Sequence, residues 1–131
     1  MENITVDEYT SIAPKTINLN AELTEAHNLM KENGIRHLPV MEGKKVVGIV
    51  SERDILANYG KPWSEFMRVK SVMSTSILFA HANDGLGEVA FRLSNEKKGS
   101  AIILNEKEEL YGIFTTTDAL NALVEIMLPQ K

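Results

Sequence analysis

Apolar side chains recur with the period of a helix early in the chain. The stripe at positions i, i+3, i+4 and i+7 consists of Leu23, Ala26, His27 and Met30. Such a stripe is typical of an amphipathic helix that packs one face on a core. Asn20 is the expected N-cap residue, and Asn33-Gly34 predicts the end of the helix, because glycine readily adopts the left-handed backbone that closes one.

Two strands and a second helix are expected next. The predicted elements are a strand at 35–41, a turn at 42–45, a strand at 46–50 and a helix from Ser51 to about Tyr59. Gly60 and Pro62 end this helix. A short apolar strand followed by a tight turn and another strand predicts a hairpin, with a helix on each side of it in the chain.

The whole pattern occurs twice. Residues 16–56 coincide with residues 63 places further on, with one extra residue in the later turn. Leu23 falls on Leu86 and Met30 on Leu93, and the segment 48–54 (Gly-Ile-Val-Ser-Glu-Arg-Asp) falls on 112–118 (Gly-Ile-Phe-Thr-Thr-Thr-Asp). The second copy predicts a helix near 86–95, strands at 100–104 and 110–114 with a turn between them, and a helix from 115 that stops before Pro129.

One unit of two strands and two helices buries too little apolar surface to be stable alone. We therefore expect an α/β fold in which two repeats pack sheet to sheet with pseudo-two-fold symmetry and share one core. The expected division is repeat one at 1–59 with an N-terminal lead-in, a linker at 60–71 and repeat two at 72–128. Such a pair has two equivalent grooves between its halves, where ligands are expected.

Composition narrows the class of protein. Hydrophobic residues make up 44% and charged residues 24% of the 131 residues, which is typical of a soluble globular protein. No apolar run is long enough for a membrane span, the acidic N-terminus lacks the features of a signal peptide, and there is no cysteine. We expect a cytoplasmic protein with no membrane partner. The net charge of −4 and the scattered basic residues argue against nucleic acid as a partner.

The repeated turn Gly-Ile-x-[Ser/Thr]-x-x-Asp allows two interpretations. In the first, Gly48 lets another group approach the backbone, free N–H groups at the helix start attract an anion, and Ser51 and Asp54 bind a phosphate and a ribose. Gly112, Thr115 and Asp118 repeat the set. In the second, hydroxyl and carboxylate only cap the helix. The turn alone does not decide between them.

The sequence gives little support for metal binding or catalysis. His27, His37 and His81 lack metal-ligand spacing, and no carboxylates or thiols cluster near them in the sequence. A catalytic triad needs Ser, His and Asp to converge, and the sequence ties no histidine to the Ser51–Asp54 turn. We expect neither an enzyme nor a metal site nor a resident cofactor.

The chain resembles a cystathionine-β-synthase (CBS) domain pair, also called a Bateman module. The resemblance rests on the order of elements, on Gly34-Ile-Arg-His-Leu-Pro-Val40, on the 48–54 turn and on Val72-Met73-Ser74 before the second copy, and it covers roughly residues 9–127. It implies a regulatory, non-catalytic module that binds adenosine-containing ligands in clefts between its repeats.

The resemblance also implies roles for individual residues. Asp54 and Asp118 would hold a ribose and Ser51 and Thr115 a phosphate, with Arg53 as a further phosphate-facing residue. An adenine pocket would be lined by Thr16, Ile17, His37, Leu38 and Pro39. The second copy departs from this pattern, because Ser100-Ala101-Ile102 replaces His37-Leu38-Pro39 and Thr117 replaces Arg53. Two unequal clefts are therefore expected.

The functional prediction is a sensor of AMP, ADP or ATP that signals occupancy to a separate target protein, because the sequence contains no effector domain. A homodimer involving the C-terminal helix is also expected, since that helix carries surplus apolar residues. Two alternatives stay open. One is a ligand-free structural or dimerisation module, and the other is a sensor of S-adenosylmethionine, NAD or a cyclic dinucleotide.

Overall fold

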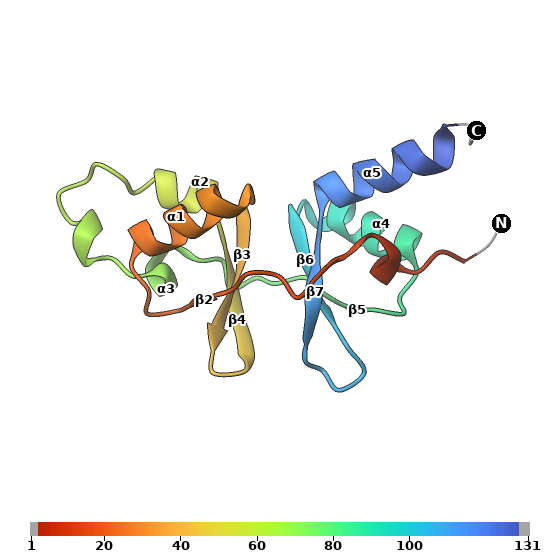
Figure 1. The fold of residues 1–131 in the computed structure, drawn as a ribbon, viewed down its shortest axis with the longest axis horizontal. Coiled ribbons are helices and arrows are strands. Elements are labelled where there is room, and N and C mark those ends of the chain that lie inside the picture. The colour runs from red at the N-terminus through yellow and green to blue at the C-terminus, as the bar shows by residue number, and fades with distance from the viewer. Residues whose placement is uncertain (1–2, 129–131) are drawn as a thin grey trace. The chain divides into compact units, whose positions relative to one another are not determined.

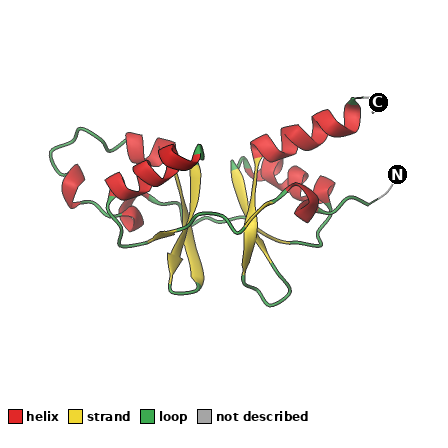
Figure 2. Cartoon of the chain, in the orientation of Figure 1, coloured by secondary structure: helices red, strands yellow, loops and turns green. Residues whose placement is uncertain are grey.

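The computed structural model describes residues 3–128 and divides into two compact units (Figure 1). Residues 14–77 form the first, called here the central unit. Residues 1–13 and 78–131 form the second, called here the terminal unit. Each combines a small sheet with helices, which confirms the mixed α/β class (Figure 2).

The central unit contains a sheet with the strand order β2-β3-β4. β2 runs parallel to β3, and β3 and β4 form an antiparallel hairpin. The elements are β2 (Ile17–Asn18), α1 (Leu23–Asn33), β3 (His37–Glu42), β4 (Lys45–Ser51), α2 (Glu52–Leu56), the 3-10 turn η2 (Ser64–Phe66) and α3 (Val69–Val72). The predicted helix–strand–turn–strand–helix order of the first repeat is confirmed.

The core of the central unit forms where the apolar stripe of α1 meets one face of the sheet. Leu23, Ala26 and Met30 from α1 are buried with Leu38 and Val40 from β3. Because side chains alternate between the faces of a strand, His37 and Pro39 lie on the other face of β3. The helical stripe that the sequence predicts therefore packs as expected.

The terminal unit contains a sheet with the order β1-β7-β6-β5. Its elements are η1 (Val6–Tyr9), β1 (Ser11–Ile12), β5 (Phe79–His81), α4 (Leu86–Glu96), β6 (Ser100–Leu104), β7 (Leu110–Thr115) and α5 (Thr116–Met127). Its core includes Leu86, Val89 and Leu93 from α4 and Phe114 from β7. The second copy of the pattern thus repeats the first in the order of its elements.

The N-terminal residues belong in space to the second repeat. Val6 is fully buried in the core of the terminal unit, and its N–H donates to the carbonyl of Asp84 at 2.8 Å. β1 then pairs antiparallel with β7. The expected first repeat at 1–59 is therefore divided, because Val6 and β1 in its N-terminal lead-in complete the core and the sheet edge of the other unit.

The predicted linker at 60–71 is also part of a packed unit. The N–H groups of Val69 and Lys70 each donate at 2.9 Å to the carbonyls of Ala21 and Leu19. Val69 is fully buried in the central core. The C-terminal end of this segment is thus bonded to the residues directly before α1, which the sequence pattern did not indicate.

The ends of the helices agree only in part with the local sequence signals. α1 ends as predicted at Gly34, which has a left-handed backbone with φ 62°. The prediction of Asn20 as N-cap is wrong, because the N-cap is Glu22 and it makes no side-chain cap. α2 ends at Leu56 rather than near Tyr59, and the Asn58 side chain donates to the carbonyl of Asp54 at 2.9 Å.

Candidate functional site

Both repeated turns form capping boxes. The Ser51 N–H donates to Oδ2 of Asp54 at 2.9 Å, and the Asp54 N–H donates to Oγ of Ser51 at 3.1 Å. Thr115 and Asp118 make the same pair of bonds at 2.8 and 3.3 Å. In both turns the cap engages Oδ2 of the carboxylate. The cap is real, and Oδ1 takes no part in it.

The start of each helix is not a cluster of free N–H groups. The N–H of Glu52 donates to the carbonyl of Arg36 at 2.9 Å, and the N–H of Thr116 donates to that of Gly99 at 3.1 Å. Within the first turn, Arg53 and Thr117 alone keep an N–H without a partner among residues 3–128. The interpretation in which free N–H groups attract an anion is therefore left with one N–H in each turn, because the cap and the carbonyls of Arg36 and Gly99 engage the others.

The glycine of each turn accommodates the chain itself. A Cβ at Gly48 would lie 2.5 Å from Sδ of Met73 and 2.9 Å from the carbonyl oxygen of Ser74. A Cβ at Gly112 would overlap the methyl group of Thr10 and lie 2.5 Å from the carbonyl oxygen of Ser11. Each glycine therefore does allow another group to approach its backbone closely. That group belongs to a second segment of the same unit.

His37 lies beside the first turn. It is directly opposite Ser51 in the register of β3 and β4, so both residues lie at one end of the sheet. Burial lowers the pKa of the imidazole; the charge of Asp54 opposes this, and that of Arg36 adds to it. The structure thus brings together His37, Ser51 and Asp54, which the sequence predicted, and Arg36, which it missed. The position of Arg36 directly before the first residue of β3 was the available signal.

The other expected wall residues differ in what they expose. Leu38 and Ile17 are buried in the core of the central unit, so their side chains face its own helices. Pro39 is also buried, on the opposite face of β3 from Leu38. Thr16 and Arg53 are exposed. Because the side chains of Leu38 and Ile17 are in this core, only their backbone atoms can line a pocket.

The equivalent end of the terminal unit has different chemistry. Ser100 lies opposite Thr115, just as His37 lies opposite Ser51, and is buried. Thr117 occupies the place of Arg53 and is exposed. The two turns share their caps and differ in the groups around them.

The described residues 3–128 contain neither a cluster of metal-ligating side chains nor a helix that could span a membrane. Among residues 3–128, no group of three or more His, Asp or Glu side chains is arranged to hold a metal ion. Within the same range, none of the helices has the length and apolar character needed to cross a bilayer.

Comparison with known proteins identifies the family. The model of the CBS domain matches residues 4–61 and again residues 69–125. This chain belongs to the CBS domain family. The two matches coincide with the two copies of the sequence pattern, so the duplicated turn is the duplicated end of a CBS motif.

Solved CBS domain pairs have the same fold. The CBS domain pair of protein MJ0100, in complex with 5-methylthioadenosine and S-adenosyl-L-methionine, has a TM-score of 0.85 at 22% identity and covers 95% of this chain and 99% of its own. CBSX2 in complex with AMP has a TM-score of 0.80 at 23% identity, with 95% and 98% coverage.

A curated relative is the uncharacterized protein MJ1232 of Methanocaldococcus jannaschii, 29% identical over 108 residues. The match covers 82% of this chain and 36% of that protein. The CBS chain described here thus spans about a third of this longer relative.

Proposed function

We propose that this CBS pair is a regulatory module that binds an adenine nucleotide, AMP or ATP, and passes its occupancy to a separate partner protein. The observation that carries the proposal is the conjunction of Ser51, Asp54 and His37 at one end of the β3–β4 hairpin in a chain of this family. The similar pairs MJ0100 and CBSX2 were solved with adenosine compounds, which supports the ligand class.

The cap and a ribose contact are compatible on Asp54. Oδ2 accepts from the Ser51 N–H and fixes the carboxylate, while Oδ1 is left to accept from the hydroxyl groups of a ribose. The side chains of Arg53 and Arg36 supply positive charge near the same end for phosphate groups. In this proposal His37 and Pro39, with Thr16 and the backbone of Ile17 and Leu38, border the adenine.

The second turn is proposed as the weaker site. Oδ1 of Asp118 likewise takes no part in the cap with Thr115, and Thr117 supplies no charge in the place of Arg53. We propose that an adenine nucleotide binds first at the Ser51–Asp54 end, and that the Thr115–Asp118 end is empty or takes a ligand without phosphate.

A thermal-shift panel tests the ligand class. It compares AMP, ADP and ATP with adenosine, S-adenosylmethionine, NAD and a cyclic dinucleotide. A ligand at 100 times its Kd stabilises the fold by about 2.7 kcal/mol, which raises Tm by about 5–15 °C for a chain of this size. A rise with the nucleotides supports the proposal. No rise with any adenosine compound at millimolar concentration leaves the ligand-free structural module as the function.

Two substitutions separate the cap from the ligand contact. Asp54→Asn keeps an acceptor for the Ser51 N–H but replaces the other oxygen with a donor, so we expect stability to change little and the nucleotide response to disappear. Ser51→Ala removes the hydroxyl of the cap and should cost about 0.5–2 kcal/mol. Asp118→Asn is the matched control at the second turn. An unchanged nucleotide response in Asp54→Asn would contradict the assigned role.

We also propose that the chain forms a homodimer in which α5 takes part. The helix exposes the large apolar side chains Leu120, Leu123, Val124, Ile126 and Met127. Exposed apolar surface of this extent is typical of an interface. Light scattering tests the proposal: the wild type should have twice the mass of the chain and Val124→Lys the mass of one chain. A monomeric wild type would exclude it.

A further inference from the structure

The segment between α2 and α3 exposes two large aromatic side chains. It extends from the helices of the central unit as a loop (Figure 1), called here the aromatic loop, residues 57–68. Trp63 is 53% exposed and Phe66 is 75% exposed, and neither takes part in the core of this unit. Because burial of such rings stabilises a protein, two exposed rings three residues apart indicate a surface that another molecule covers.

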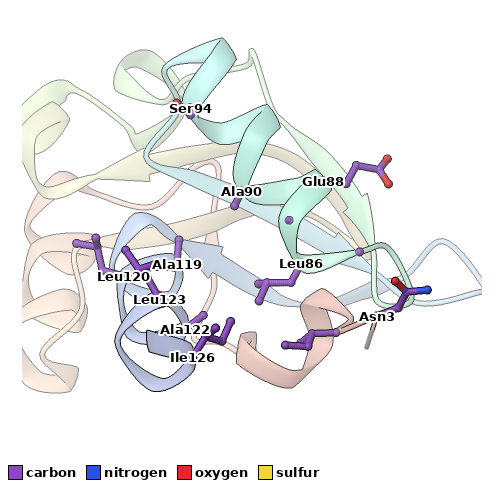
Figure 3. Close-up of a pocket in the computed structure, with 13 residues that line it drawn as sticks. Asn3, Leu86, Glu88, Ala90, Ser94, Ala119, Leu120, Ala122, Leu123 and Ile126 are labelled. Carbon is purple, nitrogen blue, oxygen red and sulfur yellow. The ribbon is translucent and has the colours of Figure 1, made fainter. Parts of the chain in front are cut away.

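This loop is distinct from the helical face proposed for the homodimer. The groove between α4 and α5 belongs to that face, because Leu120, Leu123 and Ile126 line it (Figure 3). The lining residues of the groove all belong to the terminal unit, whereas the aromatic loop belongs to the central unit. The aromatic loop therefore needs an occupant of its own.

The loop has an ordered shape and is joined to the proposed nucleotide site. The Phe66 N–H donates to the carbonyl of Trp63 at 3.0 Å, and Nζ of Lys61 lies 5.8 Å from the centre of the Trp63 ring. At the start of the loop, the Asn58 side chain donates to the carbonyl of Asp54 at 2.9 Å. The second repeat has a continuous helix of 12 residues here, whereas α2 has five. The loop therefore distinguishes the first repeat from the second.

The loop and the start of α3 are basic. Residues 57–70 contain three Lys and Arg residues against one Glu, a net charge of +2. Glu22 lies 3.7 Å from Nη1 of Arg68 and offsets one of these charges. Lys61 and Lys70 are exposed and form no ion pair with the part of the chain that the structure describes. Two cations close to the exposed rings in the sequence are therefore available to carboxylates of another molecule.

The fold does not require this positive charge. The Lys70 N–H donates to the carbonyl of Leu19, just as the Asp7 N–H in the terminal unit donates to the carbonyl of Ala82. Donors and acceptors of the two bonds are each 63 residues apart, which is the spacing of the repeat. The same backbone position thus carries a basic side chain in one unit and an acidic one in the other, so its charge is free to serve binding.

We propose that the aromatic loop binds the partner protein, through a segment in which acidic side chains flank apolar ones, and that nucleotide at the Ser51–Asp54 end changes this affinity. The proposal rests on the proposed function in assuming a separate partner. Trp, Phe, Met and Arg, all present at 63–68, are enriched at protein interfaces. An anionic bilayer fits less well, because Glu65 lies between the two aromatic residues and the excess of basic residues is small.

Fluorescence titration of the chain tests the proposal, because Trp63 is its only tryptophan. The probe is a synthetic peptide of about 12 residues that alternates Asp and Glu with Leu and Phe, and a second peptide carries Lys in place of each acidic residue. Without nucleotide, the acidic peptide should bind saturably and shift the Trp63 emission to shorter wavelength. The Lys peptide should bind at least about tenfold more weakly.

Three substitutions locate the contact. Phe66→Ser should weaken binding of the acidic peptide at least about tenfold. Phe91→Ser is the matched control, because Phe91 is 67% exposed on α4, and it should leave binding unchanged. Lys70→Asp introduces the residue that the terminal unit has at the equivalent position. It should weaken binding at least about threefold while the fold stays intact, which circular dichroism checks.

Addition of AMP tests whether the loop responds to the nucleotide site. AMP should change the affinity for the acidic peptide at least about fivefold, because Asn58 joins the loop to Asp54. Equal affinity with and without AMP, in a chain that binds AMP in the thermal-shift panel, would overturn this coupling. A chain that binds the peptide but no adenosine compound would overturn the nucleotide proposal and the coupling with it, and would leave the docking surface supported.

Five results would overturn the docking surface. Three concern the peptides: no saturable binding of the acidic peptide, equal binding of both peptides, or binding that Phe66→Ser leaves intact. A shift of the Trp63 emission with vesicles of phosphatidylserine and phosphatidylcholine, but not with the acidic peptide, would assign the loop to a membrane surface. A concentration-dependent shift in the chain alone that Phe66→Ser removes would assign the loop to a second copy.

Discussion

Met73 lies directly over Gly48, and its sulfur occupies the space that a side chain at position 48 would need. Next to this contact, the backbones of Ile49 and Ser74 exchange hydrogen bonds of 3.0 and 2.8 Å. In the other unit, Gly112 is covered by Thr10 and Ser11 in the same manner. The glycine of the repeated motif is thus the point at which a distant segment of each unit crosses a strand.

Gly48→Ala and Gly112→Ala should each destabilise the protein. The added methyl group meets backbone atoms that cannot move without breaking the adjacent pairing, so the free energy of unfolding should fall by about 1–3 kcal/mol. Gly87→Ala is the matched control. Nothing lies within 4 Å of its Cβ position and it is in a helix, so alanine there should raise stability by about 0.5–1 kcal/mol. Urea unfolding measures all three.

Lys97→Gly should stabilise the protein. Lys97 closes α4 with a left-handed φ of 55°, at the place where Gly34 closes α1. Glycine adopts this backbone without steric cost, so the free energy of unfolding should rise by about 0.5–1 kcal/mol. Gly34→Ala is the reciprocal change and should lower stability by about 1 kcal/mol. Equal melting temperatures for Lys97→Gly and the wild type would show that the left-handed backbone of Lys97 has no steric cost.

Val6→Ala should destabilise the terminal unit although it lies at the opposite end of the sequence. Val6 is fully buried there, and removing two methyl groups from a core costs about 2–3 kcal/mol. NMR-monitored urea unfolding should show the loss in the signals of β6 and β7. Ile12→Ala, at a position 63% exposed, should change stability by less than about 0.5 kcal/mol. A loss of stability confined to the NMR signals of the central unit would contradict the assignment of Val6 to the terminal unit.

His37 should make stability fall in acid. Burial lowers the pKa of the imidazole in the fold, with Asp54 acting in the opposite direction. Above the unfolded pKa of about 6.5, the ring is neutral in both states and contributes no difference. As the pH falls below that value, the unfolded chain takes up the proton more readily, and stability is lost.

The measurement compares urea unfolding at pH 7.5 and pH 5.5 for the wild type and His37→Gln. The wild type should lose more stability between the two values than the variant, because the variant has no proton to bind at this position. Equal losses of stability in the wild type and in His37→Gln would show that a group other than His37 causes the acid sensitivity.

Part of the candidate site was readable from the sequence. Ser51 and Asp54 are three residues apart, and the cap between them needs only local geometry, so the capping interpretation, one of the two that the spacing allowed, is confirmed. The same spacing gave no information about the N–H groups of Glu52 and Thr116. Their partners are the carbonyls of Arg36 and Gly99, each directly before a strand, and a pattern along the chain does not identify which carbonyl will face them.

The sequence by itself determined the duplication, the order of elements in each repeat, the end of α1 at Gly34 and the two capping turns. These features depend on residues within a few positions of one another, where spacing and backbone preference decide the outcome. Tertiary structure alone decided that Val6 and β1 complete the second repeat and that Met73 covers Gly48. Each depends on a choice between distant segments of similar apolar character, and only packing of the complete core distinguishes them.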